Sequence, residues 1–374
     1  MKLLRPLSII VSWLALSAGA SAQISLTPPA AQAPPPASKP AAKHRPKGPA
    51  AAGKPATTAK PAAPAATVTP APAPDDPNAD YVYTAYQLGK YKTAYDLALK
   101  RAQDNHDPKA MTMLGELLAN GMGVKRDEAK AADWYKRASD GGDREAMFAL
   151  AMLRIAGRGG PVNREEAVKL LASSAKLGNP KASYNLALLY LDGQTLPQDV
   201  KRAAELLRVA ADAGNAEAQY ALATFYKEGT GVEKDLEKSV RLLQAASLAD
   251  NVDAEVEYAI ALYNGTGTPK NQAAAVALLR KAARQDSPIA QNRLARVLLS
   301  GIGAPMDKVE AMKWHIVAKS AGKGDPDLDA ALASLSPEDR AKAEAAARKW
   351  LGIQSSALTP PRPQGTQSGG FEPH

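Results

Sequence analysis

A period of 36 residues constrains the fold of this chain more than any other feature. A column of small residues recurs at this spacing, and a column of large apolar residues follows it four positions later. The small column is Ala110, Ala146, Ala182, Ala218, Ala254 and Ala290, and the large column is Leu114, Leu150, Leu186, Leu222, Tyr258 and Leu294. Residues four apart share one face of an α-helix, and small residues beside large ones let two helices approach closely. Each period therefore predicts a helix in its first half.

A second helix is predicted in the other half of every period. Its small residues are Ala131, Ala167, Ala203, Ser239, Ala275 and Ala311, and three positions later come Trp134, Leu170, Leu206, Leu242, Leu278 and Trp314. This spacing gives one apolar stripe, and charged residues cover the opposite side of the helix. Six helix–turn–helix units over residues 108–323 predict an all-α solenoid, in which each repeat packs on its neighbours.

Helix starts and turns recur in the same register. Twelve residues suited to helix N-caps precede the predicted helices. They are Asp107, Asp143, Asn179, Asn215, Asn251 and Ser287 before the first helices, and Asp127, Asn163, Asp199, Asp235, Asn271 and Asp307 before the second. A glycine pair such as Gly121 and Gly123 lies between the two helices of most units. A glycine turn before a helix also occurs at phosphate sites, but its recurrence along the array indicates a left-handed helix end and room before the cap.

The segments outside the repeats differ in composition and in predicted role. Residues 1–22 have a charged start, a short apolar core and an Ala-Ser-Ala cleavage site, as in a cleaved secretory signal peptide. Residues 23–78 form an Ala/Pro/Lys-rich linker that we expect to be disordered. Residues 79–107 are expected to be a degenerate N-terminal capping repeat, and residues 324–351 a pair of C-terminal capping helices. The remaining tail, residues 352–374, is also expected to be disordered.

The net charge of +9 is concentrated before the repeats. Residues 1–74 hold eight Lys/Arg and no acid, so the predicted folded part is almost neutral. A basic face for nucleic acid is therefore not indicated, and we expect no nucleic-acid partner. The linker is expected to be either a solvated tether or a contact to peptidoglycan or anionic envelope polymers. No further segment is apolar enough to span a membrane, so we expect the periplasm as the location, with no stable membrane insertion after cleavage.

The sequence offers no set of residues for catalysis. Cysteine is absent, which excludes disulfides, thiolate metal ligands and a cysteine nucleophile. His315 shares its column with Tyr135 and four leucines, so we expect it to have a packing or capping role. No nucleotide-binding or hydrolase motif occurs, and the carboxylates are spread over helix surfaces. We therefore expect no enzyme activity, no catalytic residue, no cofactor and no metal site.

Two stretches carry a resemblance to a known repeat family. They are AMTMLGELLANGMGVKRDEAKAADWYKRASDGG, which begins at Ala110, and AQYALATFYKEGTGVEKDLEKSVRLLQAASLAD, which begins at Ala218. Both resemble the Sel1-like repeat, a relative of the tetratricopeptide repeat. The resemblance implies an α/α superhelix that scaffolds protein complexes. In exported bacterial members it implies roles in periplasmic signalling, envelope regulation and contact with hosts. Thr195, Asp250 and Asp286 replace glycines of the pattern, which puts no catalytic residue in doubt because the repeat has none.

The first helices present a second face about 200° round from the alanine and leucine columns. By analogy with related superhelices, this face is expected to line a concave groove for peptides or partner helices. The predicted partner-binding residues on it are Phe148, Met152, Tyr184, Leu188 and Tyr220, because aromatic residues dominate binding hot spots. The alternative is that these side chains belong to the core. Exposure of more than half would favour the groove, and full burial would exclude it.

Together these features predict an exported, non-enzymatic interaction scaffold of the bacterial envelope. It would regulate a signalling or envelope-assembly protein through its concave helical surface. One alternative is a structural envelope protein that binds peptidoglycan or anionic polymers through its basic linker. A second alternative is a secreted host-interaction factor. The expected partners are proteins, with cell-wall polymers as a further partner of the linker.

Overall fold

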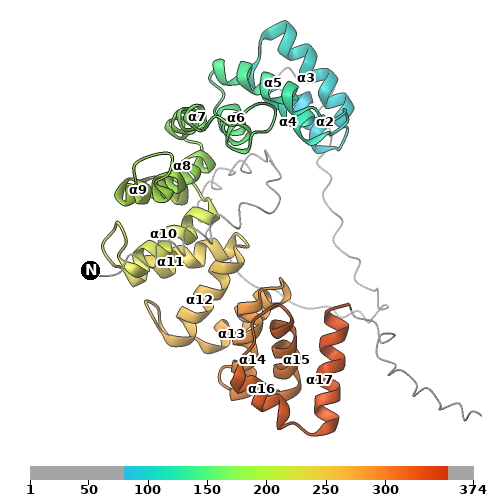
Figure 1. The fold of residues 1–374 in the computed structure, drawn as a ribbon, viewed down its shortest axis with the longest axis vertical. Coiled ribbons are helices and arrows are strands. Elements are labelled where there is room, and N and C mark those ends of the chain that lie inside the picture. Colours follow the sequence, from blue (N-terminus) through green and yellow to red (C-terminus); the bar gives the residue numbers. More distant parts are fainter. Residues whose placement is uncertain (1–79, 353–374) are drawn as a thin grey trace, which may run out of the picture. The chain divides into compact units, whose positions relative to one another are not determined.

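The computed structural model describes residues 80–352, which form α-helices and no strand (Figure 1). The prediction of an all-α solenoid built from helix–turn–helix repeats is confirmed. Within these residues no helix combines the length and the apolar character needed to cross a membrane. The predicted signal peptide and linker, and the tail beyond residue 352, lie outside the described residues.

The helices belong to two compact units, residues 80–163 and residues 164–352. Within the first unit every helix packs against the next one along the chain, and the same holds in the second unit from α7 to α16, whereas α17 packs on α15. The first unit contains α2 (Tyr81–Gln87), α3 (Tyr91–Asn105), α4 (Pro108–Asn120), α5 (Glu128–Asp140) and α6 (Arg144–Ala156). The second unit contains α7 (Arg164–Lys176), α8 (Pro180–Asp192), α9 (Val200–Asp212), α10 (Ala216–Glu228), α11 (Leu236–Leu248), α12 (Val252–Asn264), α13 (Gln272–Arg284), α14 (Pro288–Ser300), α15 (Lys308–Ser320), α16 (Pro326–Ala333) and α17 (Pro337–Trp350).

Polar caps fix where the repeat helices begin. At eleven of these helices the side chain of the preceding residue accepts a backbone N–H from the first turn. The residues are Asp107, Asp127, Asp143, Asn179, Asp199, Asn215, Asp235, Asn251, Asn271, Ser287 and Asp307. The prediction is confirmed at these positions. Replacing such a cap with alanine typically costs about 1 kcal/mol, so the caps together hold the register of the array.

The glycine turns end the first helices and also bring repeats together. The first glycine of each turn lies in the left-handed region, with φ between 65° and 78°, as predicted. The second glycine does more than give the chain room before the next cap. At Gly231 a Cβ would lie 2.8 Å from the carbonyl oxygen of Val200, at the start of the second helix in the preceding repeat. This glycine therefore permits backbone contact between successive repeats.

The alanine and leucine columns form the core. All six alanines of the first column are buried, and so are the five leucines of the second column, whereas Tyr258 is half-buried. Gly115 stands where the other repeats have alanine. A Cβ at this position would lie 2.6 Å from the ring of Tyr135, which is fully buried and occupies a column that holds leucine in four repeats. The missing methyl group makes room for the larger ring.

Gly115→Ala should destabilise the protein by about 1–3 kcal/mol, because an added methyl group in a filled core displaces its neighbours. Tyr135→Leu in the same chain should recover most of this loss, since the alanine–leucine pair is the one used in other repeats. Urea unfolding of the wild type, the two single variants and the double variant measures the coupling. Additive effects of the two substitutions would contradict the assigned contact.

The regular register ends before α16. Lys323 occupies the position at which the period places a helix cap, and α16 begins instead after Asp325. Asp325 is only 5% exposed, and Arg296 Nε on α14 donates to its carboxylate at 2.7 Å. At the far end, α17 packs on α15, and the Trp350 ring contacts the Trp314 ring edge to face. These contacts close the C-terminal end of the array.

Candidate functional site

The five predicted partner-binding residues differ in their exposure. Phe148 on α6 is buried, with 8% of its surface exposed, and Met152 on the same helix is half-buried. Tyr184 and Leu188 on α8 and Tyr220 on α10 are also half-buried. The first two residues belong to the first unit and the other three to the second unit. None of the five exposes more than half of its surface, the exposure that would favour the groove, and none is fully buried. Partner binding at these residues stays a prediction, and Tyr184, Leu188 and Tyr220 are the ones with partly open side chains in a single unit.

Tyr220 has a ring fixed by the core and a hydroxyl in an acidic environment. The ring packs against a buried cluster contributed by α10, α11 and α12. Burial raises the pKa of the Tyr220 hydroxyl, and the carboxylates of Asp253, Glu257 and Glu228 raise it further. The side chain is therefore held in one place, while negative charge from two helices surrounds its polar end.

Tyr184, one repeat earlier in the chain, lies in a similar environment. Burial raises the pKa of Tyr184 to about 12, and Glu217 on α10 contributes to this rise. Glu217 and Asp253 occupy the same position in successive repeats, two residues after the helix cap. Each tyrosine thus lies in the electrostatic field of an acid on the first helix of the next repeat.

These residues define one surface of the second unit, which we call the tyrosine–acid surface. Its members are Tyr184, Leu188, Tyr220, Glu217, Glu228, Asp253 and Glu257. Glu257 forms an ion pair with Lys227 at 2.7 Å. The three other acids, Glu217, Glu228 and Asp253, form no ion pair within residues 80–352. These acids were not predicted from the sequence. The recurrence of an acid two residues after the cap, beside an aromatic column, is a signal that could have identified Glu217 and Asp253.

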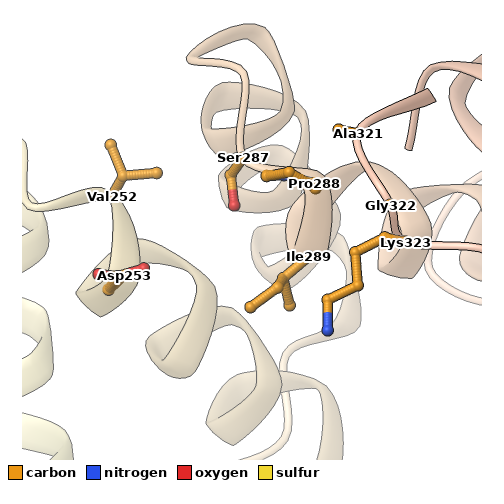
Figure 2. A pocket seen from close by; sticks show the side chains of 8 residues that line it. All are labelled: Val252, Asp253, Ser287, Pro288, Ile289, Ala321, Gly322 and Lys323. Atoms are coloured by element: carbon orange, nitrogen blue, oxygen red, sulfur yellow. The ribbon is translucent and has the colours of Figure 1, made fainter. Parts of the chain in front are cut away.

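A cavity of about 340 Å³ opens beside Asp253. The first turns of α12 and α14 and the loop after α15 line it (Figure 2). Figure 2 shows Val252 and Asp253 on one wall, with Ile289 and Lys323 on the opposite wall. The cavity lies where the loop before α16 is longer than the repeat requires, because the helix cap has moved from residue 323 to Asp325.

The remaining candidates for chemistry in the described residues are clusters of metal ligands and the buried His315. Across residues 80–352 no group of three or more His, Cys, Asp or Glu residues could hold a metal ion. His315 is fully buried, which agrees with its predicted packing role. Its Nε2 lies 2.8 Å from Asp329 Oδ1 on α16, and Lys319 Nζ donates to the same oxygen at 2.7 Å. The histidine therefore joins α15 to α16.

The six repeats of the sequence match a known repeat family. The model described as the Sel1 repeat matches residues 108–143, 144–179, 180–215, 216–251, 252–287 and 288–323. The predicted resemblance is confirmed by these six consecutive matches. Among curated proteins, none has a sequence that matches this chain.

Solved structures with the same repeat show the same fold. A Sel1 repeat protein from Oxalobacter formigenes is 26% identical, with a TM-score of 0.57; the match covers 64% of this chain and 98% of that protein. A protective antigen of uropathogenic Escherichia coli with an SLR fold is 24% identical, with a TM-score of 0.51. That match covers 70% of this chain and 64% of the antigen, so the chain spans less than two thirds of the antigen's length.

Proposed function

The chain belongs to the Sel1 repeat family, and from this premise we propose that it is an exported scaffold of the bacterial envelope that binds a protein partner. Sel1 repeat proteins are generally non-enzymatic scaffolds, so protein binding is the activity that family membership supports. We propose that the partner contacts the tyrosine–acid surface. The binding event would regulate a signalling or envelope-assembly protein.

The half-burial of Tyr184, Leu188 and Tyr220 is the observation that carries this proposal. A side chain that is held by the core loses little conformational freedom on binding, and its open edge can still contact a partner. Aromatic residues in such positions contribute much of the binding energy at interfaces. The exposed acids Glu217, Glu228 and Asp253 would select a partner with complementary positive charge and speed its association.

The proposed location rests on residues 1–22 and on the basic segment that follows. A charged start, an apolar core and the Ala20-Ser21-Ala22 site are typical of a cleaved export signal. The absence of cysteine leaves no thiol that an oxidising compartment could modify. A signal-sequence deletion should keep the protein in the cytoplasm, which cell fractionation measures.

Tyr184→Ala and Tyr220→Ala should each weaken partner binding by about 1–3 kcal/mol, because each removes an aromatic contact from the proposed interface. Binding is measured by calorimetry with the protein captured by crosslinking from residue 184 in cells. Tyr220→Ala also removes a ring that packs on the core, so circular dichroism must show that both variants keep their helix content at the assay temperature.

Tyr226→Ala is the matched control for these variants. Tyr226 is half-buried on the same helix as Tyr220, but its ring faces Lys238 and its hydroxyl lies 3.4 Å from Arg208 Nη2 on α9. It therefore lies outside the tyrosine–acid surface, and its replacement should leave the affinity unchanged. If all three substitutions weaken partner binding equally, the effect is due to a loss of stability. If Tyr184→Ala and Tyr220→Ala leave the affinity unchanged, the proposed interface is contradicted.

A further inference from the structure

The last repeat shows how the chain itself pairs an acid near the start of a helix. α16 follows the sixth repeat, at the place in the chain where a seventh repeat would begin. Asp327 lies two residues after the Asp325 cap of α16, and Arg296 lies nine residues after the Ser287 cap of α14. Arg296 Nη2 donates to Asp327 Oδ2 at 3.2 Å, and the same guanidinium forms two hydrogen bonds to Asp325. An arginine on one first helix thus pairs with an acid in the first turn of the next capped helix of this register.

The tyrosine–acid surface has acids in the same register but no arginine. Glu217 on α10 and Asp253 on α12 each lie two residues after a helix cap. Nine residues after the preceding caps, at the position that holds arginine in the last repeat, are Leu188 on α8 and Thr224 on α10. Neither of these side chains carries a charge, and neither acid forms an ion pair within residues 164–352. This part of the array therefore has the acids without the cation.

The repeats between these two places have an apolar residue at both positions. Ile260 lies nine residues after the cap of α12, and Ile289 lies two residues after the cap of α14. Both pack against the same buried cluster. Figure 2 shows Asp253 and Ile289 at the corresponding position in the first turns of α12 and α14. Within residues 164–352 the two positions are therefore matched in character at α12–α14 and α14–α16, and they are mismatched at the tyrosine–acid surface.

The surroundings of these two acids suit a guanidinium group. Besides burial, Glu217 raises the pKa of Tyr184, so this acid lies close to the tyrosine hydroxyl. Besides burial, Asp253 raises the pKa of Tyr220, and Glu228 adds further negative charge there. A guanidinium can donate two hydrogen bonds to a carboxylate while its flat face packs on an aromatic ring. An ammonium group lacks this planar fork and is more strongly hydrated.

We propose that the partner binds this surface through two arginine side chains. One guanidinium pairs with Glu217 beside Tyr184. The other pairs with Asp253 beside Tyr220, one repeat further along the array. Each takes the place that Arg296 has in the last repeat. The proposal rests on the proposed function, because it specifies the chemical group that the tyrosine–acid surface recognises. Two arginines in one polypeptide bind together, so each contact alone can be weak.

Synthetic peptides test this assignment on the full chain. The probes carry two arginines separated by Gly/Ser spacers of several lengths, and matched probes carry lysine or the neutral isostere citrulline in their place. We expect the best arginine probe to bind about threefold tighter than its lysine counterpart and about tenfold or more tighter than its citrulline counterpart, as measured by calorimetry. Equal affinity for the arginine and lysine probes would overturn the assignment of a guanidinium.

Thr224→Arg places an arginine at the position of Arg296 and should fill one of the two sites within the chain. It should weaken binding of the arginine probe about tenfold. Without any peptide, an NMR titration should show a lower pKa for Asp253, which partial burial and the carboxylate of Glu257 raise in the wild type. Ala277→Arg adds the same charge at an exposed position on α13, and it should change neither quantity. Unchanged affinity for the probe, or an unchanged pKa of Asp253, would overturn the proposal.

Asp253→Asn tests the same site with little risk to the fold, because this side chain is exposed. It should weaken binding of the arginine probe about fivefold or more, since it removes the charge that the guanidinium pairs with. Glu237→Gln removes the charge of an acid that is 80% exposed on α11, and it should leave the affinity unchanged. Circular dichroism must show equal helix content in both variants. Equal effects of the two substitutions would overturn the assigned site.

Partner capture separates this proposal from the proposed function. If both hold, Thr224→Arg and an excess of the arginine probe should each reduce crosslinking of the partner from residue 184. Capture that both leave unchanged would overturn the arginine assignment alone. Arginine-selective binding of the probe without any captured partner would overturn the partner-binding function alone.

Discussion

Gly267→Ala should destabilise the protein by about 3 kcal/mol, whereas Gly214→Ala should cost only about 1 kcal/mol. Both glycines lie in the left-handed region, with φ of 71° and 85°, so both substitutions share a conformational cost. Only at Gly267 would the new Cβ also overlap a backbone atom, the carbonyl oxygen of Leu236 in the preceding repeat. At Gly214 no atom lies within 4 Å of the added carbon.

Urea unfolding followed by circular dichroism measures this difference. Repeat arrays can open one repeat at a time, so hydrogen exchange of α11 and α12 should accompany the unfolding curves. We expect faster exchange in both helices for Gly267→Ala, because the substitution separates their repeats. Equal losses for the two variants would show that the second glycine of the turn serves conformation alone.

Arg296→Met should destabilise the protein by about 2–4 kcal/mol at pH 7, because it removes the positive charge and two of the hydrogen bonds that stabilise a buried carboxylate. Asp325 is 5% exposed, and Arg296 donates to it through Nε at 2.7 Å and Nη2 at 2.8 Å. Asn292 Nδ2 would remain as a side-chain donor, at 3.0 Å. Asp325 also caps α16. Leaving its carboxylate without the Arg296 guanidinium would therefore loosen the C-terminal end of the array.

The pH dependence of this effect has a definite sign. Burial raises the pKa of Asp325, but donors from Asn292 and Arg296 outweigh burial and hold the pKa below its usual range. In the wild type this carboxylate therefore stabilises the fold above about pH 4, and the contribution is lost as the pH falls through the lowered pKa. In Arg296→Met the guanidinium no longer offsets burial, so the pKa of Asp325 should rise above its wild-type value. The variant can then protonate Asp325, so its deficit should shrink as the pH falls from 7 towards about 4.

Arg293→Met is the matched control, since Arg293 is exposed on the same helix and forms no ion pair within residues 80–352. Its effect should stay within about 0.5 kcal/mol at every pH. Thermal unfolding at several pH values measures the stability of the wild type and of both variants. A deficit of Arg296→Met that does not change with pH would contradict the assigned role of the carboxylate.

The fold could be predicted from the sequence because its determinants are local and repeated. The caps and the first glycine of each turn set the helix bounds through contacts a few residues apart. The alanine and leucine columns then fix which face is buried. Contacts between repeats were harder to predict. Gly115 makes room for Tyr135, and Gly267 contacts the backbone at Leu236. Both contacts depend on how closely two helices approach, and the period alone does not specify this distance.

The candidate site could be predicted only in part. Phe148, Tyr184 and Tyr220 share one column, yet Phe148 is buried and the two tyrosines are half-buried. The column fixes the direction in which a side chain leaves its helix, whereas the neighbouring side chains determine how much of it is exposed. Glu217, Asp253 and Glu257 come from the repeat after the tyrosine that they face, so pairing them with it requires the distance between helices. One wall of the cavity is the loop at Lys323, where the period places a cap and the chain has a lysine, so the sequence pattern did not predict it.

Photocrosslinking in cells tests directly whether the tyrosine–acid surface binds a protein partner. A photoreactive amino acid is placed at residue 184 and, as the control, at residue 241, which is exposed on α11. We expect a defined protein adduct from residue 184 and none from residue 241, with mass spectrometry identifying the partner. The same adduct from both positions, or no adduct from residue 184, would contradict this expectation.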